Sequence, residues 1–300
     1  MNILITGCNG QLGSELTRIL TAGQSELGTI PLAFQSVSVR GVDIDTLDIA
    51  DNQQVQNYFK DKAFDVVFNC AAMTNVDKCE SEMDAAYKAN VVGAGNIAAV
   101  AEMCGAKLIH VSTDYVFDGN GNKPYVEWDQ TVPNTAYGKS KLLGEQYAQR
   151  ACKKTFIVRT AWLYGYVGNN FVKTILRAAR DGGALKVVDD QRGNPTNAAD
   201  LAHHLLMLAA SDYYGTYHCT GNGECSWFEF TKEIILLAGI SCELMPCTTE
   251  EFPRPAPRPA YSALDNLALR CTVGDQMRPW QAAIAAYMTH YNQKSGEIAL

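Results

Sequence analysis

The sequence predicts an α/β fold with a doubly wound, mostly parallel sheet, and two features of the chain support this prediction. Short apolar runs alternate with amphipathic segments through the first half of the chain, which is the pattern of βαβ units. Connections between parallel strands are right-handed, so helices are expected on both faces of the sheet. The alternation loosens after about residue 165, which predicts a smaller, interleaved α+β part.

The elements of the first half follow from hydrophobic periodicity. Buried runs predict strands at 2–6, 36–43, 64–72, 107–113 and 155–165. Apolar residues at helical spacing predict helices from Leu12 onward and over 51–62, 82–103 and 137–151. The stretch 23–34 contains glycine, serine and proline and is expected to be a loop.

The elements of the second half are less regularly spaced. The periodicity predicts helices at 171–182, 198–211 and near 280–292, and strands at 185–190 and 215–221. Residues 253–259, PRPAPRP, form a segment that proline keeps extended.

Composition narrows the class of protein. The chain has 300 residues, of which 47% are hydrophobic, which is enough for a large core. A net charge of -7 argues against nucleic-acid binding. The start MNILITGCNG has no basic leader, and no run of 18 apolar residues exists, so we expect a cytoplasmic protein without a membrane span. The ten cysteines form no CxxC pair, so we expect reduced thiols and no metal site.

Three glycines mark the turn after the first strand. Gly7, Gly10 and Gly13 have the spacing GxxGxxG and open the first helix. Glycine permits a positive φ and lets a pyrophosphate approach the backbone, and the helix N-terminus adds free N–H groups. The alternative is a merely tight turn. We therefore expect a dinucleotide-binding, Rossmann-type domain at 1–162, which segments near 198–221 rejoin, and a mainly substrate-binding part at 163–300.

An acidic residue is expected where the second strand ends, because it would meet the adenosine ribose. Asp43 is the candidate and lies 30 residues beyond Gly13. An acid there favours NADH, whereas Arg40 would favour NADPH if it pointed inward. The alternative for Asp43 is a solvated loop carboxylate. The sequence leaves the choice between NADPH and NADH open.

Tyr137 and Lys141 are four residues apart on a predicted helix and therefore share a face. A free phenol has a pKa of about 10, and a shift of about three units is roughly 4 kcal/mol. One ammonium about 4 Å away supplies about that much at an effective dielectric constant near 20. Thr113 ends a buried strand, where its hydroxyl would hold a substrate carbonyl. A surface coincidence is the alternative for the pair.

Eight ordered motifs give the chain a family resemblance. They are GCNGQLG (7–13), LDIAD (47–51), NCAAMTNVDKCE (69–80), STDYVFDG (112–119), YGKSK (137–141), RTAWLYG (159–165), DDQRGNPT (189–196) and RPAYSALD (258–265). In these motifs the chain resembles the extended short-chain dehydrogenase/reductases and, within them, the dTDP-4-dehydrorhamnose reductase family.

The resemblance implies hydride transfer from NADPH or NADH to the C4 ketone of dTDP-4-dehydro-L-rhamnose. It implies that Tyr137 donates the proton, that Lys141 holds the nicotinamide ribose and lowers the tyrosine pKa, and that Thr113 binds the carbonyl oxygen. The cofactor would contact Gly7, Gly10, Gln11, Leu12, Gly13, Asp43, Asp48, Ile49, Ala71, Ala72, Met73, Thr74, Val111, Tyr137 and Lys141. The substrate would contact Thr113, Asp114, Tyr115, Trp162 and Arg258.

Several alternatives stay open. Trp162 would otherwise pack in the core, Arg258 would cap the proline segment, and Asn90 would hydrogen-bond backbone near the site or satisfy a neighbouring loop. Glu15 lacks a convincing acidic partner for the magnesium-bridged dimer of some relatives, so we expect a monomer or weak homodimer. The alternative functions are a nucleotide-binding regulatory subunit, like that of methionine adenosyltransferase, and a reductase or epimerase of another nucleotide sugar.

Overall fold

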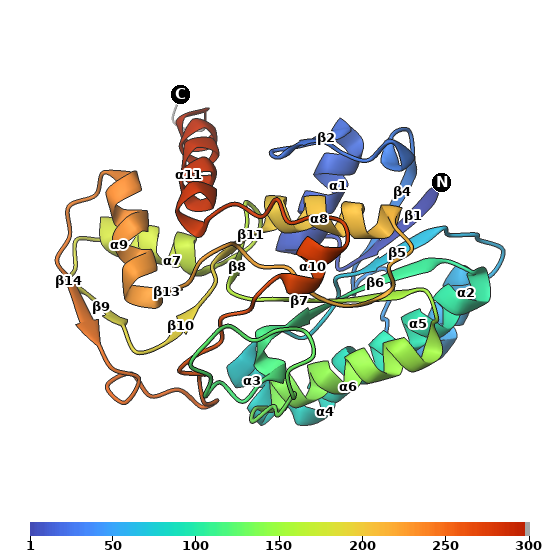
Figure 1. The fold of residues 1–300 in the computed structure, drawn as a ribbon, viewed down its shortest axis with the longest axis horizontal. Coiled ribbons are helices and arrows are strands. Elements are labelled where there is room, and N and C mark those ends of the chain that lie inside the picture. Colours follow the sequence, from blue (N-terminus) through green and yellow to red (C-terminus); the bar gives the residue numbers. More distant parts are fainter. Residues whose placement is uncertain (298–300) are drawn as a thin grey trace.

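The computed structural model describes the backbone of residues 1–297 and the side chains of residues 1–291. Its centre is a six-stranded sheet in the order β12-β7-β6-β5-β1-β4, and every neighbouring pair is parallel (Figure 1). The strands are β1 (Asn2–Thr6), β4 (Ser38–Val42), β5 (Val66–Asn69), β6 (Lys107–Thr113), β7 (Thr155–Thr160) and β12 (Gly215–His218). The predicted fold class, a Rossmann-type parallel sheet, is confirmed.

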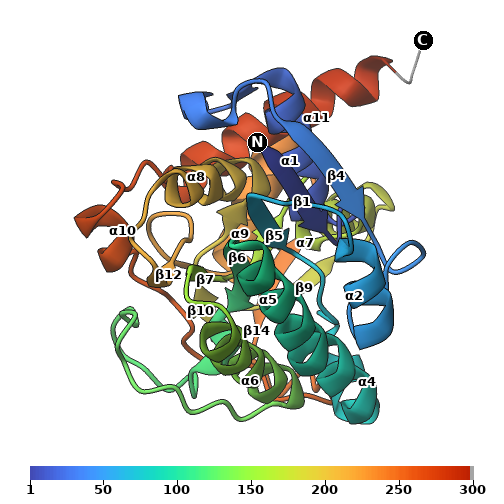
Figure 2. The ribbon, with the colours of Figure 1, turned by 90° about the vertical axis from the view of Figure 1, so that its right-hand side faces the viewer.

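Helices cover both faces of this sheet. Figure 2 shows α1 (Gln11–Ala22) and α8 (Ala198–Ala210) on one side and α2 (Asn52–Phe59), α5 (Gly93–Cys104) and α6 (Ala136–Ala151) on the other. Successive residues of a strand point to opposite faces. Ile3 and Ile5 accordingly join the core under α1 and α8, whereas Leu4 joins the core under α2, α5 and α6.

A second lobe lies beside the C-terminal ends of the strands. Its helices are α7 (Phe171–Arg180), α9 (Trp227–Ala238) and α11 (Trp280–Glu297), which pack around the buried side chains of Tyr164, Phe230 and Tyr287. Short strand pairs complete it: β8 (Leu163–Tyr164) with β11 (Thr196–Asn197), β9 (Leu185–Val188) with β14 (Leu244–Cys247), and β10 (Arg192–Gly193) with β13 (Cys225–Ser226). Between these segments the chain returns to the main sheet through α8 and β12.

The structure differs from the sequence prediction in three segments. Residues 23–34 are no plain loop, because they form the hairpin β2 (Gln24–Ser25) and β3 (Gly28–Thr29) and a short 3-10 turn. The predicted helix 82–103 is α4 (Met83–Tyr87), a π-helical segment (Lys88–Val92) and α5. The predicted strand 155–165 is broken at Trp162, whose φ of 47° is incompatible with a continuous strand.

No element was predicted for residues 222–252, where α9 and β14 lie. A signal was present, because Ser226 and Glu229 form a capping box at the start of α9. Two short helices, α3 (Val76–Ser81) and α10 (Leu267–Cys271), were missed as well. Within the described part of the chain, no helix is both long and apolar enough to cross a membrane.

The strand order fixes where a ligand can bind. From β1 the chain runs outward to β4 on one side and then crosses to β5 on the other. Open α/β sheets bind ligands in the crevice beyond the strand carboxyl ends at such a reversal. Residues that follow β1, β5, β6 and β7 therefore share one crevice, and the second lobe closes its far side.

Candidate active site

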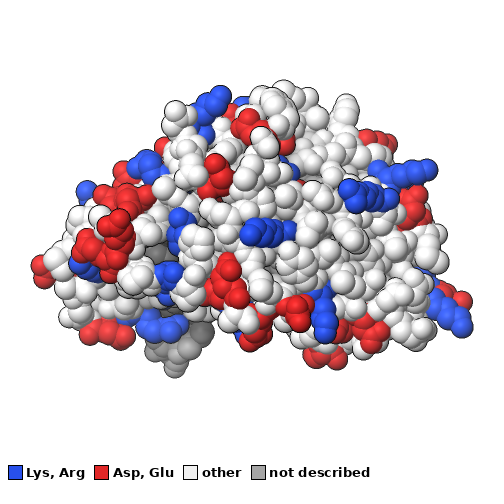
Figure 3. All heavy atoms as spheres, turned by 90° about the horizontal axis from the view of Figure 1, so that it is seen from below, with Lys and Arg blue, Asp and Glu red and all other residues white. Residues whose placement is uncertain are grey.

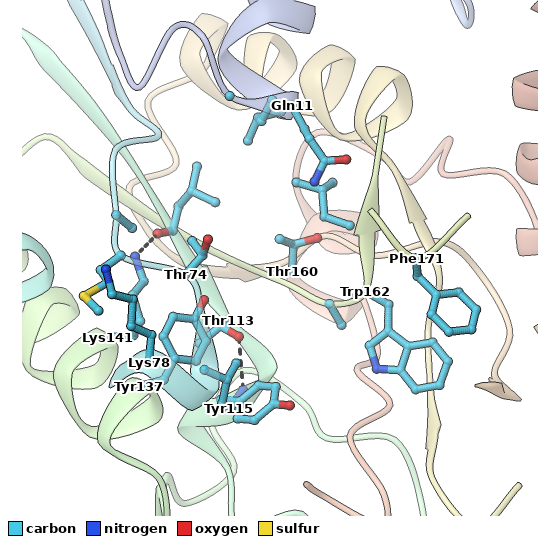
Figure 4. A pocket seen from close by; sticks show the side chains of 18 of the residues that line it. Gln11, Thr74, Lys78, Thr113, Tyr115, Tyr137, Lys141, Thr160, Trp162 and Phe171 are labelled. Carbon is cyan, nitrogen blue, oxygen red and sulfur yellow. Dashed lines mark hydrogen bonds between the residues drawn. The ribbon is translucent and has the colours of Figure 1, made fainter. Parts of the chain in front are cut away.

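A cavity of about 1670 Å³ occupies this crevice. It extends from the glycine turn after β1 to the second lobe, where α7 and β9 line it. Every residue that the sequence analysis assigned to the cofactor or the substrate lines this cavity. Figure 4 shows Tyr137, Lys141, Thr113 and Tyr115 on one side and Trp162 and Phe171 on another.

The glycine turn forms a cradle that side chains would fill. Gly7 has φ 64°, and its carbonyl accepts a hydrogen bond from the Gly10 N–H at 3.1 Å. A Cβ on Gly13 would lie 2.2 Å from the Gly7 oxygen, closer than any real contact. This turn and the start of α1 therefore fit a dinucleotide pyrophosphate, which needs bare backbone and free N–H groups.

Replacing Gly13 with alanine is expected to raise the KM for NADPH at least tenfold, because the added methyl group displaces the Gly7 carbonyl. Such overpacking costs about 1–3 kcal/mol. Steady-state kinetics and urea unfolding would measure the two effects. Gly183→Ala is the matched control, since nothing lies within 4 Å of a Cβ at that glycine. Equal KM values for the two variants would contradict the assignment of the cradle.

Asp43 follows β4 and lies beside the glycine turn. One carboxylate oxygen accepts a hydrogen bond from the Asn9 N–H at 3.0 Å and the other from the Ile44 N–H at 2.9 Å. The carboxylate is therefore held at the rim of the cavity, so it is not a freely solvated loop group. Arg40 is exposed on β4 and is not among the residues that line the cavity.

The three residues proposed for catalysis lie on one side of the cavity (Figure 4). The N-cap Thr135 starts α6, which places Tyr137 and Lys141 on the buried side of its first turns. The Lys141 ammonium donates to the Val111 carbonyl at 2.7 Å, and the Tyr137 and Thr113 side chains are hydrogen-bonded. All three side chains are buried.

Burial dominates the electrostatics of Tyr137. Burial raises the pKa of Tyr137, and the hydrogen bond with Thr113 opposes this only in part. Burial also lowers the pKa of Lys141 to about 8, with Glu145 acting in the opposite direction. Burial is therefore the largest influence on the pKa of Tyr137, and the lowering of that pKa by Lys141 stays a prediction.

Asp114 and Tyr115 extend the site from Thr113. The Thr113 hydroxyl donates to Asp114 at 2.9 Å and accepts from the Tyr115 N–H at 3.3 Å. Burial raises the pKa of Asp114 to about 6. The Tyr115 ring contacts the edge of the Tyr137 ring, with centroids 5.5 Å apart. These contacts fix the rotamers around the proposed proton donor.

Trp162 both lines the cavity and packs against the second lobe. Its ring stacks on Trp227 with centroids 3.4 Å apart and an angle of 4° between the planes. A Cβ on Gly193 would lie 2.6 Å from the indole, so only glycine leaves room for it. Phe171 packs against Trp227 and also lines the cavity. The result is an apolar aromatic end opposite Tyr137.

Arg258 lies in the proline-rich segment and does two things. Its Nη1 donates to the Ala256 carbonyl at 3.0 Å, as expected of a cap of that segment, and its Nη2 donates to Asp77 at 2.8 Å.

Asn90, in the π-helical segment, accepts a hydrogen bond from the Met73 N–H at 2.8 Å and donates to the Met73 carbonyl and to Ser140. Asn90 therefore holds backbone that lines the cavity.

Sequence reasoning missed several residues of this cavity. Phe171 and Trp227 were not singled out, and neither was Arg254, although all three line it. Asp77 lies inside the motif at 69–80, but the sequence analysis gave it no role.

Among the side chains that the structure describes, no group of three or more His, Cys, Asp or Glu residues is arranged to hold a metal ion. Glu15 instead pairs with Arg18.

One face of the molecule shows mixed surface charge, whereas several cationic side chains line the cavity. Figure 3 shows a face on which Lys and Arg side chains are interspersed with Asp and Glu, without a uniformly basic area. The cationic residues that line the cavity are Lys78, Lys141, Lys186, Arg254 and Arg258. Anionic ligands would therefore be attracted by these few cations rather than by the overall field.

Comparisons with known proteins agree with this architecture. The model of the family described as "RmlD substrate binding domain" matches residues 1–293. The Spore coat polysaccharide biosynthesis protein SpsK of Bacillus subtilis is 41% identical over 286 residues, which cover 95% of this chain and 96% of that protein.

Two solved structures are similar over almost the whole chain. A dTDP-4-dehydrorhamnose reductase from Clostridium acetobutylicum is 46% identical with a TM-score of 0.92, covering 97% of this chain and 100% of the other. The dTDP-4-dehydrorhamnose reductase from Bacillus anthracis, solved in complex with NADP, is 39% identical with a TM-score of 0.89, covering 96% and 99%. The family predicted from the motifs is confirmed. The chain therefore belongs to the RmlD substrate binding domain family, the family of dTDP-4-dehydrorhamnose reductases that its motifs resemble.

Proposed function

We propose that this chain reduces the C4 ketone of dTDP-4-dehydro-L-rhamnose to the alcohol of dTDP-L-rhamnose, with NADPH or NADH as the reductant. The observation that carries the proposal is the meeting of Tyr137, Lys141 and Thr113 in one cavity that also contains the glycine cradle. The cavity volume of about 1670 Å³ exceeds the roughly 300–1,000 Å³ of a pocket for one small ligand. It is large enough for a dinucleotide and a nucleotide sugar together.

The raised pKa of Tyr137 suits a proton donor. A reduction needs the phenol protonated before the reaction, and burial keeps it so at neutral pH. When bound, the nicotinamide would supply a hydride, a hydrogen nucleus with two electrons, which forms the new C–H bond at C4 of the sugar. The Tyr137 O–H bond breaks as the proton moves to the carbonyl oxygen, so the ketone becomes an alcohol. To hold that oxygen, the Thr113 hydroxyl would turn its one hydrogen from Asp114, to which it donates at 2.9 Å, toward the carbonyl oxygen.

The far end of the cavity suits the nucleotide part of the substrate. Trp162, Trp227 and Phe171 offer aromatic surface for a base or a deoxysugar. Arg254 and Arg258 also line the cavity, with Arg258 near Tyr115, and a guanidinium fork fits a diphosphate. Asp43 would accept hydrogen bonds from the adenosine ribose of the cofactor at the opposite end.

An assay of the wild-type protein tests the proposal. NADPH and NADH are each mixed with dTDP-4-dehydro-L-rhamnose, and the nicotinamide absorbance is followed. Oxidation that depends on this sugar supports the proposal. Nucleotide binding without oxidation would favour the regulatory subunit, and oxidation only with other 4-keto nucleotide sugars would favour a different reductase.

The activity is expected to decline above about pH 8. Lys141 has a pKa of about 8 because burial disfavours its charged form, so the ammonium loses its proton as the pH rises through that value. The neutral amine would then bind the nicotinamide ribose less well. Measuring kcat/KM for NADPH from neutral to alkaline pH tests this. Lys141→Arg is the control, because its guanidinium stays charged and its lower activity should show no such decline. A wild-type profile that stays flat would contradict the role of Lys141.

A further inference from the structure

The proline-rich strap, defined here as residues 253–258, has few backbone donors with which to attach itself. Pro253, Pro255 and Pro257 carry no N–H group. The strap nevertheless lines the cavity with Arg254 and Arg258. Because proline fixes φ but supplies no donor, the placement of this segment depends on a small number of other contacts.

The residues on either side of the strap are well anchored. Before it, the Thr249 N–H donates to Asp190 at 2.8 Å. After it, the Tyr261 N–H donates to the Gly119 carbonyl at 2.9 Å, and the Arg192 N–H donates to the Ala260 carbonyl at 2.9 Å. The strap itself spans the gap between these two anchors.

Asp77, near the start of α3, forms hydrogen bonds with the strap. Its Oδ1 accepts from the Ala256 N–H at 3.2 Å and its Oδ2 from Nη2 of Arg258 at 2.8 Å. Among the described residues, these are the hydrogen bonds that join the strap to the rest of the chain. The two side chains of the ion pair are only 19% and 26% exposed, so solvent screens the pair less than a surface pair.

These contacts hold the Arg258 guanidinium at two points. Nη1 donates to the Ala256 carbonyl inside the strap and Nη2 donates to Asp77. A guanidinium has five N–H groups, so others stay available for an anion. The pKa of Asp77 is lowered, because the hydrogen bonds from Arg258 and Ala256 outweigh the opposing effect of burial. Asp77 is therefore a carboxylate that orients a cation at the cavity wall.

We infer that Asp77 is a positioning residue for the diphosphate of the nucleotide sugar, acting through Arg258 and the strap. The inference rests on the proposed function. With a net charge of -7 the protein depends on a few local cations to bind such an anion. Fixing Arg258 beforehand removes side-chain entropy that binding would otherwise cost. The opposite role, in which Asp77 competes with the diphosphate for Arg258, predicts the opposite change in KM.

Kinetics separate the two roles. Asp77→Asn is expected to raise the KM for the nucleotide sugar about tenfold, as for loss of a charge-assisted hydrogen bond, with kcat and the KM for NADPH little changed. Adding Asp77→Asn to Arg258→Ala should cause no further rise, because Asp77 acts through Arg258. Asp84→Asn, an exposed acid on α4 that does not line the cavity, is the control for the charge change. An unchanged or lower KM in Asp77→Asn overturns the inference, and so does an additive double variant.

Two measurements without turnover keep the inference separate from the proposed function. Amide hydrogen exchange should show the Ala256 N–H protected in the wild type and exposed in Asp77→Asn, while β6 stays protected in both. Calorimetry with dTDP should show weaker binding to Asp77→Asn but unchanged binding to Asp84→Asn. If the wild type binds dTDP yet reduces no sugar, only the proposed function fails. Rapid exchange of Ala256 in the wild type, or equal dTDP affinity in the two variants, overturns the inference itself.

Discussion

Tyr137→Phe is expected to lower kcat by roughly 10²–10⁴-fold, the usual contribution of a general acid. The phenylalanine ring fills the same space between Tyr115 and the cavity, but it has no proton to donate to the carbonyl oxygen. Binding of NADPH should be unchanged, because the backbone cradle and Lys141 are untouched. Single-turnover kinetics with saturating cofactor would measure the chemical step.

The control for this variant is Tyr147→Phe, which removes a hydroxyl from the half-exposed outer side of the same helix. It should keep wild-type turnover and show that loss of a phenol on α6 is harmless in itself. Full activity in Tyr137→Phe would remove the proposed proton donor. The reaction would then need another acid, and Asp114, which accepts from Thr113 and has a pKa of about 6, would be the candidate.

Arg159→Met is expected to destabilise the fold by about 3–5 kcal/mol, the usual cost of leaving a buried charge without its partner. Arg159 on β7 donates to both oxygens of Glu145 on α6, at 2.9 and 2.8 Å. Both side chains are almost fully buried, and Ser112 also donates to Glu145. Urea unfolding would measure the loss, which is a large part of the stability of about 5–15 kcal/mol of most proteins.

A double variant shows whether the unpaired charge causes the loss. Glu145→Gln combined with Arg159→Met leaves no charge at this position, and replacing a whole buried pair by neutral groups is often nearly neutral. We expect the double variant to regain most of the stability that Arg159→Met loses. A double variant that is as unstable as Arg159→Met would instead assign the loss to the contact of the arginine guanidinium with the Phe117 ring, whose centroid lies 5.3 Å from Cζ.

Local patterns made the sheet and the glycine turn predictable from the sequence. Period-two and period-3.6 spacing depends on neighbouring residues, so strands such as β1 and β6 and helices such as α1 and α6 lie close to the predicted ranges. Because ligands of open α/β sheets bind beyond the carboxyl ends of the strands, the position of Thr113 at the end of a strand predicted that it belongs to the same site as Tyr137. The structure places them in one cavity, although their catalytic roles are still proposals.

The other features of the candidate site depend on contacts between residues far apart in the sequence, which no local pattern encodes. Trp227 stacks on Trp162 although 65 residues separate them in the chain, and Asp77 meets Arg258 across an even longer separation. The pKa of Tyr137 could not be predicted because it depends on burial, which is set by α3, α6 and the segment after β6 together. The spacing of a tyrosine and a lysine indicates that they share a helix face, but it does not indicate the burial that raises the pKa of the tyrosine.

Transfer of deuterium tests the central claim most directly. Wild-type protein is incubated with dTDP-4-dehydro-L-rhamnose and with each of the two NADPH epimers that carry deuterium at C4 of the nicotinamide. The proposed reaction predicts that one epimer, and not the other, delivers deuterium to C4 of the sugar in dTDP-L-rhamnose, as NMR would show. NADPH oxidation without deuterium at that carbon, or no reduced sugar with either epimer of NADPH or of NADH labelled in the same way, would contradict it.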